Sequence, residues 1–181
     1  MADIRPGRPD EVIDHGEVRL RRHGDDDLDA VYQAVTESLD HLRPWMPWAA
    51  DYTRQAAWEF LTASARRWAE GTEYNYAIVA DGTLAGGAGL MARIGPGGLE
   101  IGYWVRQGYT RRGLATAASA ALVEQAFRLP GVERVEIVTD ELNLASAGVA
   151  RKLGFTEAGR RTLDLPPPAG TGTGVVWRLA R

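Results

Sequence analysis

The first residues whose types and spacing suit chemistry are two arginines and a glycine in front of a predicted helix. Arg111, Arg112 and Gly113 precede the segment 114–129, whose first half is built mainly from Ala, Ser and Thr. The first turn of a helix has backbone N–H groups without intrahelical partners and a partial positive charge, which together favour an anion such as phosphate. Gly113 and the small residues after it leave that backbone accessible. The pattern predicts a phosphate site, with a plain strand–helix turn as the alternative.

Composition and motifs exclude several other classes of function. The 181 residues include neither a Walker P-loop nor a G-x-G-x-x-G dinucleotide motif. No Cys is present, which excludes thiol nucleophiles and disulfides, and we expect no metal site. A net charge of −3 gives no indication of nucleic-acid binding, and no apolar run is long enough to span a membrane. The first sixteen residues lack the apolar region of a signal peptide, so we expect a cytoplasmic protein.

The elements that position this turn follow from hydrophobic periodicity and from turn residues. We expect a first helix that starts at the acidic residues 25–27, and further helices at 55–70, 114–129 and 145–153. The order of elements predicts a mixed α/β fold. Residues 1–181 are expected to form one domain, with 1–16 as a loose N-terminal extension. The expected strands are 17–22, 76–80, 84–93, 99–105, 133–139, 155–165 and 175–179.

Three segments resemble the GNAT acyl-CoA N-acyltransferases, in the order found in that family. They are EIGYWV at 100–105, YTRRGLAT at 109–116 and NLASAGVARKLGF at 143–155. Together with HLRPWMPW at 41–48, they are most similar to the RimJ/RimL branch. The resemblance covers nearly the whole chain. It implies a GNAT-like, mostly antiparallel sheet of about seven strands, flanked by helices on both faces and splayed between its fourth and fifth strands, here 99–105 and 133–139.

The resemblance also implies that the predicted phosphate site holds acetyl-CoA or another acyl-CoA. The family motif Q/R-x-x-G-x-G/A aligns with 110–115, where Thr110 departs from the usual Gln or Arg. Helix capping is the alternative role for the two residues nearest the 145–153 helix. The residues implied to bind the coenzyme are Trp104, Val105, Arg111, Arg112, Gly113, Leu114, Ala115, Thr116, Asn143 and Ser146.

The implied reaction is direct attack of a neutral amine on the thioester in a ternary complex. The backbone amide of Val105 is implied to polarise the carbonyl. Glu100 is the leading candidate for the base, and strand alternation places it on one face with Trp104. The alternative is a glutamate paired with a nearby arginine. Ser146 is the candidate that protonates or hydrogen-bonds the leaving sulfur, because the tyrosine usual in segment 143–155 is missing.

The acceptor site is implied to include His41, Trp45 and Trp48, with His41 as the second candidate for the base. The loop 166–174 forms either a lid or a long hairpin turn. A site with only a modest base favours an acceptor amine of lowered pKa. The acceptor is a protein N-terminal α-amine or a small-molecule amine, and a homodimer is compatible with the sequence. The alternative function is a non-catalytic coenzyme A-binding module on the same scaffold.

Overall fold

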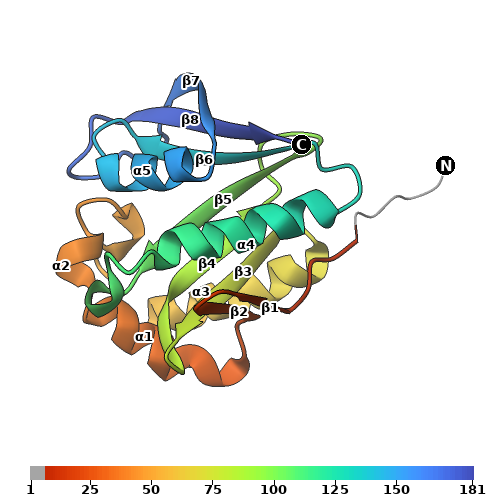
Figure 1. The fold of residues 1–181 in the computed structure, drawn as a ribbon. Helices are drawn as coiled ribbons and strands as arrows, with labels where there is room; N and C mark the ends of the chain where they lie inside the picture. The colour runs from red at the N-terminus through yellow and green to blue at the C-terminus, as the bar shows by residue number, and fades with distance from the viewer. Residues whose placement is uncertain (1–6) are drawn as a thin grey trace.

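The computed structural model describes residues 7–181, in which eight strands form a single sheet (Figure 1). The strand order is β1-β2-β3-β4-β5-β6-β8-β7, and each neighbouring pair is antiparallel except β5–β6. The strands are β1 (Val12–His15), β2 (Val18–Arg22), β3 (Glu73–Ala80), β4 (Thr83–Met91), β5 (Gly98–Val105), β6 (Arg134–Asp140), β7 (Thr156–Thr162) and β8 (Thr173–Ala180).

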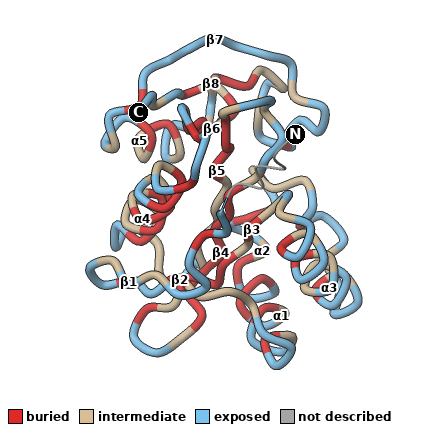
Figure 2. The backbone as a smooth tube through the Cα atoms, turned by 90° about the vertical axis from the view of Figure 1, so that its right-hand side faces the viewer, coloured by how far each residue is buried: buried red, intermediate tan, exposed pale blue. Residues whose placement is uncertain are grey.

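Helices lie on both faces of this sheet. Figure 2 shows α4 and α5 on one side of the sheet and α1 and α3 on the other. No helix in the described part of the chain is both long and apolar enough to cross a membrane. The helices are α1 (Leu28–Thr36), α2 (Leu39–Leu42), α3 (Arg54–Glu70), α4 (Leu114–Arg128) and α5 (Leu144–Lys152), and short 3₁₀ turns are η1 (Asp25–Asp27), η2 (Pro47–Ala49) and η3 (Gln107–Tyr109).

The ends of the helices follow local sequence signals. α3 begins after Thr53, whose Oγ1 accepts a hydrogen bond of 3.1 Å from the Ala56 amide, and it ends at Gly71, whose φ is +73°. α4 begins after Gly113, whose φ is +78°, and ends two residues before Pro130. The small residues Ala118 and Ala121 are fully buried, and they let α4 pack closely on the sheet.

The expected mixed α/β fold with a mostly antiparallel sheet is confirmed, with two corrections. The sheet has eight strands instead of about seven, because residues 12–15, expected in a loose extension, pair with β2 as β1. This strand was missed because it has only four residues and lies partly exposed at the sheet edge. Residues 1–6 of the expected extension lie outside the described residues. The helix α2 was also not expected.

The predicted splay is present between β5 and β6. Their parallel pairing begins at Gly98 and ends at Ile101, which lies opposite Ile137, although β5 continues to Val105. The Arg106 amide donates a hydrogen bond of 2.8 Å to a β4 carbonyl, that of Ala85. Because backbone groups alternate sides along a strand, those of Tyr103 and Val105 point to the open side, toward β6. The second half of β5 therefore offers an unpaired backbone edge.

Candidate functional site

The N-terminus of α4 is an open cradle of backbone amides. The first intrahelical hydrogen bond runs from the Ala117 amide to the Gly113 carbonyl, at 3.0 Å, so the amides of residues 114–116 make up the free first turn. No side chain caps this turn in the described residues. A Cβ added at Gly113 would meet no atom within 4 Å, so the space above these amides is open. Leu114 contributes only its backbone, because its side chain is buried in the core.

The two predicted arginines of this turn differ in their surroundings. Arg112 Nη1 lies 2.8 Å from Asp81, in the turn between β3 and β4, and its guanidinium stacks on the Tyr109 ring at 5.2 Å. Arg111 is exposed, forms no ion pair within the described residues and has a φ of +61°, unusual for a residue other than glycine. The Thr110 hydroxyl donates to the Gln107 carbonyl at 2.9 Å. Arg111 is therefore the cation that is free to meet an anion.

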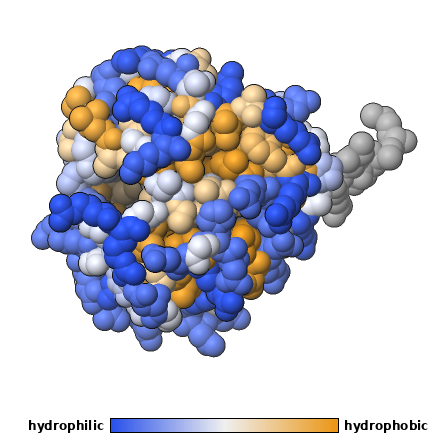
Figure 3. Space-filling view, in the orientation of Figure 1, coloured by the Kyte–Doolittle hydropathy of each residue, from blue (hydrophilic) through white to orange (hydrophobic). Residues whose placement is uncertain are grey.

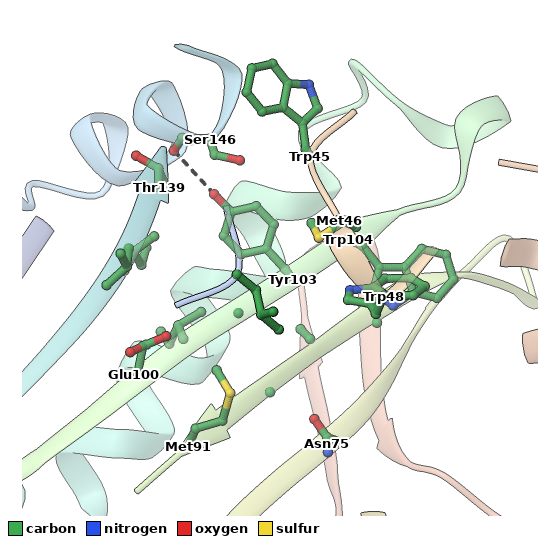
Figure 4. Close-up of a pocket in the computed structure, with 18 of the residues that line it drawn as sticks. Trp45, Met46, Trp48, Asn75, Met91, Glu100, Tyr103, Trp104, Thr139 and Ser146 are labelled. Atoms are coloured by element: carbon green, nitrogen blue, oxygen red, sulfur yellow. Dashed lines mark hydrogen bonds between the residues drawn. The ribbon is translucent and has the colours of Figure 1, made fainter. Parts of the chain in front are cut away.

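A cavity of about 580 Å³ begins at the splay and extends over β4 toward α1 and η2. The space-filling view shows a hollow in the surface between α5 and α2, which lies below α5 in this orientation (Figure 3). Figure 4 shows aromatic side chains at one end of the cavity, Glu100 at the other and Tyr103 between them. Its lining includes Trp45, Met46, Trp48, Tyr52, Glu73, Asn75, Gly87, Met91, Arg93, Glu100, Tyr103, Trp104, Asp140, Asn143, Ser146, Leu165 and Pro167.

Aromatic rings form one end of this cavity. The Trp48 ring lies 6.3 Å from that of Trp104 and 5.9 Å from that of Tyr52, centroid to centroid, both edge to face. Trp104 needs glycine on the neighbouring strand, because a Cβ at Gly87 would lie 2.6 Å from its Nε1 atom. Trp45, the second predicted tryptophan, also lines the cavity. This end suits a flat or apolar group of the acceptor.

Glu100 lies at the polar end, buried between two arginines. Its Oε1 accepts a hydrogen bond from Arg93, and its Oε2 lies 3.3 Å from Arg161 Nη2. The register of β4 and β5 contains no bulge, so Glu100, Gly102 and Trp104 share the face predicted from alternation. The structure thus contains the arginine pairing that was the alternative for Glu100. Its role as a base stays a prediction.

The start of α5 closes the cavity on the side of β6. Asn143 Oδ1 accepts a hydrogen bond of 3.1 Å from the Ser146 amide, so Asn143 caps the helix, as its alternative role required. Both residues also line the cavity, so capping and coenzyme contact are compatible. The Tyr103 hydroxyl donates to the Ser146 carbonyl at 3.3 Å, and burial raises the pKa of Tyr103 to about 12. Sequence reasoning missed Tyr103, although it stands within the EIGYWV motif.

The loop between β7 and β8 is held in place by Asp140. This buried carboxylate accepts hydrogen bonds from the amides of Leu142, Thr171 and Gly172, at 3.0, 3.2 and 2.9 Å. The Ala169 amide donates to the Pro44 carbonyl at 2.9 Å, which ties the loop to the tryptophan-containing segment. The loop therefore forms a fixed wall of the cavity. Asp140 was missed, because its partners lie about thirty residues away in the chain.

The structure places most of the predicted site residues in two groups, one along the cavity and one at the start of α4. Glu100, Trp104, Asn143, Ser146, Trp45 and Trp48 line the cavity. Residues 111–116 do not line it and instead form the cradle at α4. His41 is exposed on α2 and does not line the cavity, so its place in the acceptor site stays a prediction that this geometry does not support. His41 lies next to the Trp-Pro segment in the sequence, but that proximity does not show whether its side chain faces the cavity or the solvent.

Both the cradle and the open edge of β5 fit acetyl-CoA. Free helix amides, beside a glycine at which an added Cβ would meet no atom within 4 Å, suit a pyrophosphate. An unpaired strand edge suits the amide groups of the pantetheine arm, as an added strand would. The residues that would hold acetyl-CoA are those at 111–116, the backbone of β5 near Val105, and Asn143 and Ser146 at α5.

Comparison with known proteins identifies the family of this chain. Residues 17–156 match the family model of the acetyltransferase (GNAT) domain, and the chain belongs to this family. It is an acetyl-CoA-dependent N-acetyltransferase, so the alternative of a non-catalytic module is set aside.

Individual relatives to which the chain is similar include RimJ and RimL. It is 26% identical, over 83% of this chain and 82% of the relative, to YdaF of Bacillus subtilis (strain 168), to which ribosomal N-acetyltransferase activity is attributed. RimL, a ribosomal L7/L12 alpha-N-protein acetyltransferase solved with coenzyme A, has a TM-score of 0.84 at 20% identity, covering 94% of this chain and 98% of RimL. Mycobacterium smegmatis RimJ has a TM-score of 0.82 at 24% identity, covering 97% and 89%.

Proposed function

We propose that this enzyme acetylates the terminal α-amine of a polypeptide. The observation that carries the proposal is the state of the carboxylates in the cavity. Among the described residues three carboxylates line it, and each is already engaged by hydrogen-bond donors. The partners are Arg67 and Asn75 for Glu73, Arg93 and Arg161 for Glu100, and the amides of Leu142, Thr171 and Gly172 for Asp140.

Because these carboxylates already accept hydrogen bonds from cations or amides, the cavity offers the acceptor amine no carboxylate without protein partners among the described residues. No histidine lines the cavity among the described residues. The acceptor must therefore arrive with an appreciable neutral fraction. An α-amine with a pKa of about 7.8 is roughly one tenth neutral at pH 7, whereas lysine at about 10.4 is about 0.04% neutral. The difference of a few hundred-fold favours the α-amine.

The residues of the site divide the remaining tasks. Acetyl-CoA supplies an acetyl group activated as a thioester. The amides of Tyr103 and Val105 on the open edge of β5 donate hydrogen bonds to carbonyl oxygens of the thioester and its arm. The aromatic end and the fixed loop hold the acceptor so that its neutral amine attacks the thioester carbon. The amine nitrogen forms the new C–N bond and the C–S bond breaks. The proton lost by the amine passes to the sulfur, so coenzyme A leaves as the thiol, and Ser146 hydrogen-bonds that sulfur.

The similarity to YdaF supports a protein acceptor, because that relative is a ribosomal N-acetyltransferase by its attributed activity. RimL, which has a similar fold, is an α-N-acetyltransferase of the ribosomal protein L7/L12. A ribosomal protein as acceptor would place this enzyme in the cytoplasm, as the sequence leads us to expect. A homodimer stays a prediction.

The test compares two peptides of one sequence that differ only in the amine left free. One has a free N-terminus and an acetylated lysine side chain, and the other has an acetylated N-terminus and a free lysine. We expect initial rates of coenzyme A release at pH 7 to favour the free N-terminus by about a hundredfold or more. Equal rates on the two peptides, or turnover of small amines with neither peptide used, would overturn the proposal.

A further inference from the structure

Part of the sheet carries arginines on a face without helices. Trp104 packs with α1, so Glu100, which shares its face, points to the α1 and α3 side of the sheet. Glu136 on β6 lies beside Glu100, and Arg178 on β8 lies beside Glu136, so all three share this face. α1 and α3 pack against β4 and β3, while α4 and α5 lie on the opposite side (Figure 2).

On this face the carboxylates are buried and the guanidinium groups are exposed. Glu100 and Glu136 are only 4% and 5% exposed. The side chains that bond to them are half exposed, at 57% for Arg93, 48% for Arg161 and 45% for Arg178. Arg178 Nε donates to Glu136 Oε1 at 2.8 Å. The anions therefore lie under the surface and fix the cations that face the solvent.

Each of these guanidinium groups has N–H donors that its glutamate does not use. A guanidinium has five N–H donors, and Arg93 and Arg161 each use one nitrogen on Glu100 within the described residues. A fourth arginine, Arg134, also lies within 3.5 Å of Glu136, but its terminal nitrogens bond to the carbonyls of Ile94 and Pro96. Four arginines thus accompany Glu100 and Glu136. Glu73, on the same face, is paired with Arg67, so this part of the face is positive although the chain is net negative.

We propose that Arg93, Arg161 and Arg178, here called the arginine face, bind an acidic segment of the acceptor polypeptide. The inference rests on the proposed function for the identity of the acceptor as a polypeptide. The face adjoins the cavity, because Glu100, which holds two of its arginines, lines that cavity. A chain whose terminal amine enters the cavity from the Glu100 end would pass over this face. Two of these guanidinium groups lie at Glu100 and the third at the neighbouring Glu136, so together they can bind more than one carboxylate of an acidic segment.

Binding without turnover tests the face directly. The probe is an acidic peptide with an acetylated N-terminus and a fluorescent label at its C-terminus, and its partner has Gln in place of every Glu. Fluorescence anisotropy measures the Kd of each peptide for the enzyme saturated with coenzyme A. We expect the acidic peptide to bind at least about tenfold more tightly at low salt, with the difference lost near 0.5 M NaCl, because exposed charges are screened.

Matched variants locate the interaction. Arg178→Gln is expected to remove most of the preference for the acidic peptide. The double variant Glu136→Gln/Arg178→Gln removes the same cation together with its buried anion, so a fold disturbed by an unpaired glutamate is avoided. Arg160→Gln is the control, because Arg160 lies beside Arg161 on β7 but pairs with Glu141 and Glu157. Equal loss in the Arg160→Gln control would overturn the proposal.

The outcomes separate this inference from the proposed function. Equal Kd values for the acidic and Gln peptides overturn the arginine face, whatever amine the enzyme acetylates. If the acidic peptide binds at this face but no free N-terminus is acetylated, the proposed function fails while the face stands. Tight binding of polyuridylate that competes with the peptide would mark the face as a nucleic-acid surface and overturn the assignment to an acidic polypeptide.

Discussion

Arg161 Nη2 lies 3.3 Å from Glu100 Oε2, although β8 and β6 separate their strands in the sheet. The pair therefore bridges the two sides of the splay: Glu100 is on β5, and Arg161 is on β7, at the far edge of the other half. Since Arg93 engages the second oxygen, Glu100 is held from both sides. This geometry favours a role in positioning the two halves around the cavity.

Replacing Glu100 tests whether it positions the site or removes a proton. Glu100→Gln keeps the size of the side chain and removes the charge that holds the two arginines. We expect a loss of stability of about 2 kcal/mol, a fall in kcat of less than tenfold and an unchanged pH dependence of kcat/KM. Urea denaturation and pH–rate profiles measure both. A loss of kcat of a hundredfold or more, with the loss of one limb of the pH profile, would identify Glu100 as the base.

The cradle can be tested with two glycines of the same backbone conformation. Gly113 and Gly131 have φ values of +78° and +77°, and a Cβ added at either meets no atom within 4 Å. Alanine at either position costs about 1 kcal/mol in stability because of the left-handed backbone. Only Gly113→Ala is expected to weaken acetyl-CoA binding, measured as a smaller rise in melting temperature with acetyl-CoA. An equal rise in both variants would remove the cradle from the coenzyme site.

The two hydroxyl groups near α5 are expected to contribute unequally. Ser146→Ala is expected to lower kcat about tenfold with little change in the KM for acetyl-CoA, because a hydrogen bond to the leaving sulfur is made mainly in the transition state. Tyr103→Phe is expected to keep kcat within about threefold, since its hydroxyl already bonds to the Ser146 carbonyl. Steady-state kinetics of both variants provides the measurement. The reverse ranking would assign the role to Tyr103.

The close packing of the Trp104 ring on Gly87 predicts that a larger residue at position 87 weakens binding of the acceptor. Gly87→Ala places a Cβ 2.6 Å from the present position of Trp104 Nε1, so the indole must move. We expect the KM for the acceptor to rise about tenfold while the KM for acetyl-CoA stays unchanged. Gly148→Ala on α5 is the control, because a Cβ there meets no atom within 4 Å. An unchanged KM for the acceptor in Gly87→Ala would separate Trp104 from acceptor binding.

The stability of the fold in acid is expected to depend on Asp27. Burial raises the pKa of Asp27, but the hydrogen bonds from Arg21 and the Gly24 amide, together with His23 at 3.6 Å, outweigh it and hold the pKa well below 3.8. Arg21 binds both carboxylate oxygens, at 2.6 and 2.7 Å. Because the folded-state pKa is depressed, the stabilisation is complete above the unfolded pKa near 4 and is lost as the pH falls below it.

Asp27→Asn measures this contribution. We expect the variant to lose about 3 kcal/mol at pH 7, and the difference from wild type to shrink as the pH falls from 4 toward 2. Urea denaturation at several pH values gives the free energies of unfolding. Asp14→Asn is the control, because Asp14 pairs with Arg19 at the exposed edge of the sheet and is expected to matter little. A difference independent of pH would contradict the assignment.

Features that depend on residues close together in the sequence could be predicted, whereas contacts between residues far apart in the sequence could not. The cradle at Gly113 was predictable, because a helix start and its flanking charges lie within a few consecutive residues. The alternation of β5 likewise placed Glu100 on one face with Trp104. By contrast, the pairing of Glu100 with Arg161 and the clamp of Asp140 on the loop near Thr171 depend on strands that meet only in the folded sheet. Local pattern carries no information on such contacts.

β5 presents backbone groups toward the splay and a side chain toward the aromatic end of the cavity. Toward the splay, Tyr103 and Val105 offer backbone groups, which any residue can provide, whereas toward the aromatic end Trp104 offers its side chain. Substitutions along this strand can therefore alter what is acetylated and leave the way the acetyl donor is held unchanged. On this strand, the contacts to acetyl-CoA depend little on side-chain identity, whereas the contacts to the acceptor depend on it. Mutations here can therefore change the acceptor while the enzyme still binds its coenzyme.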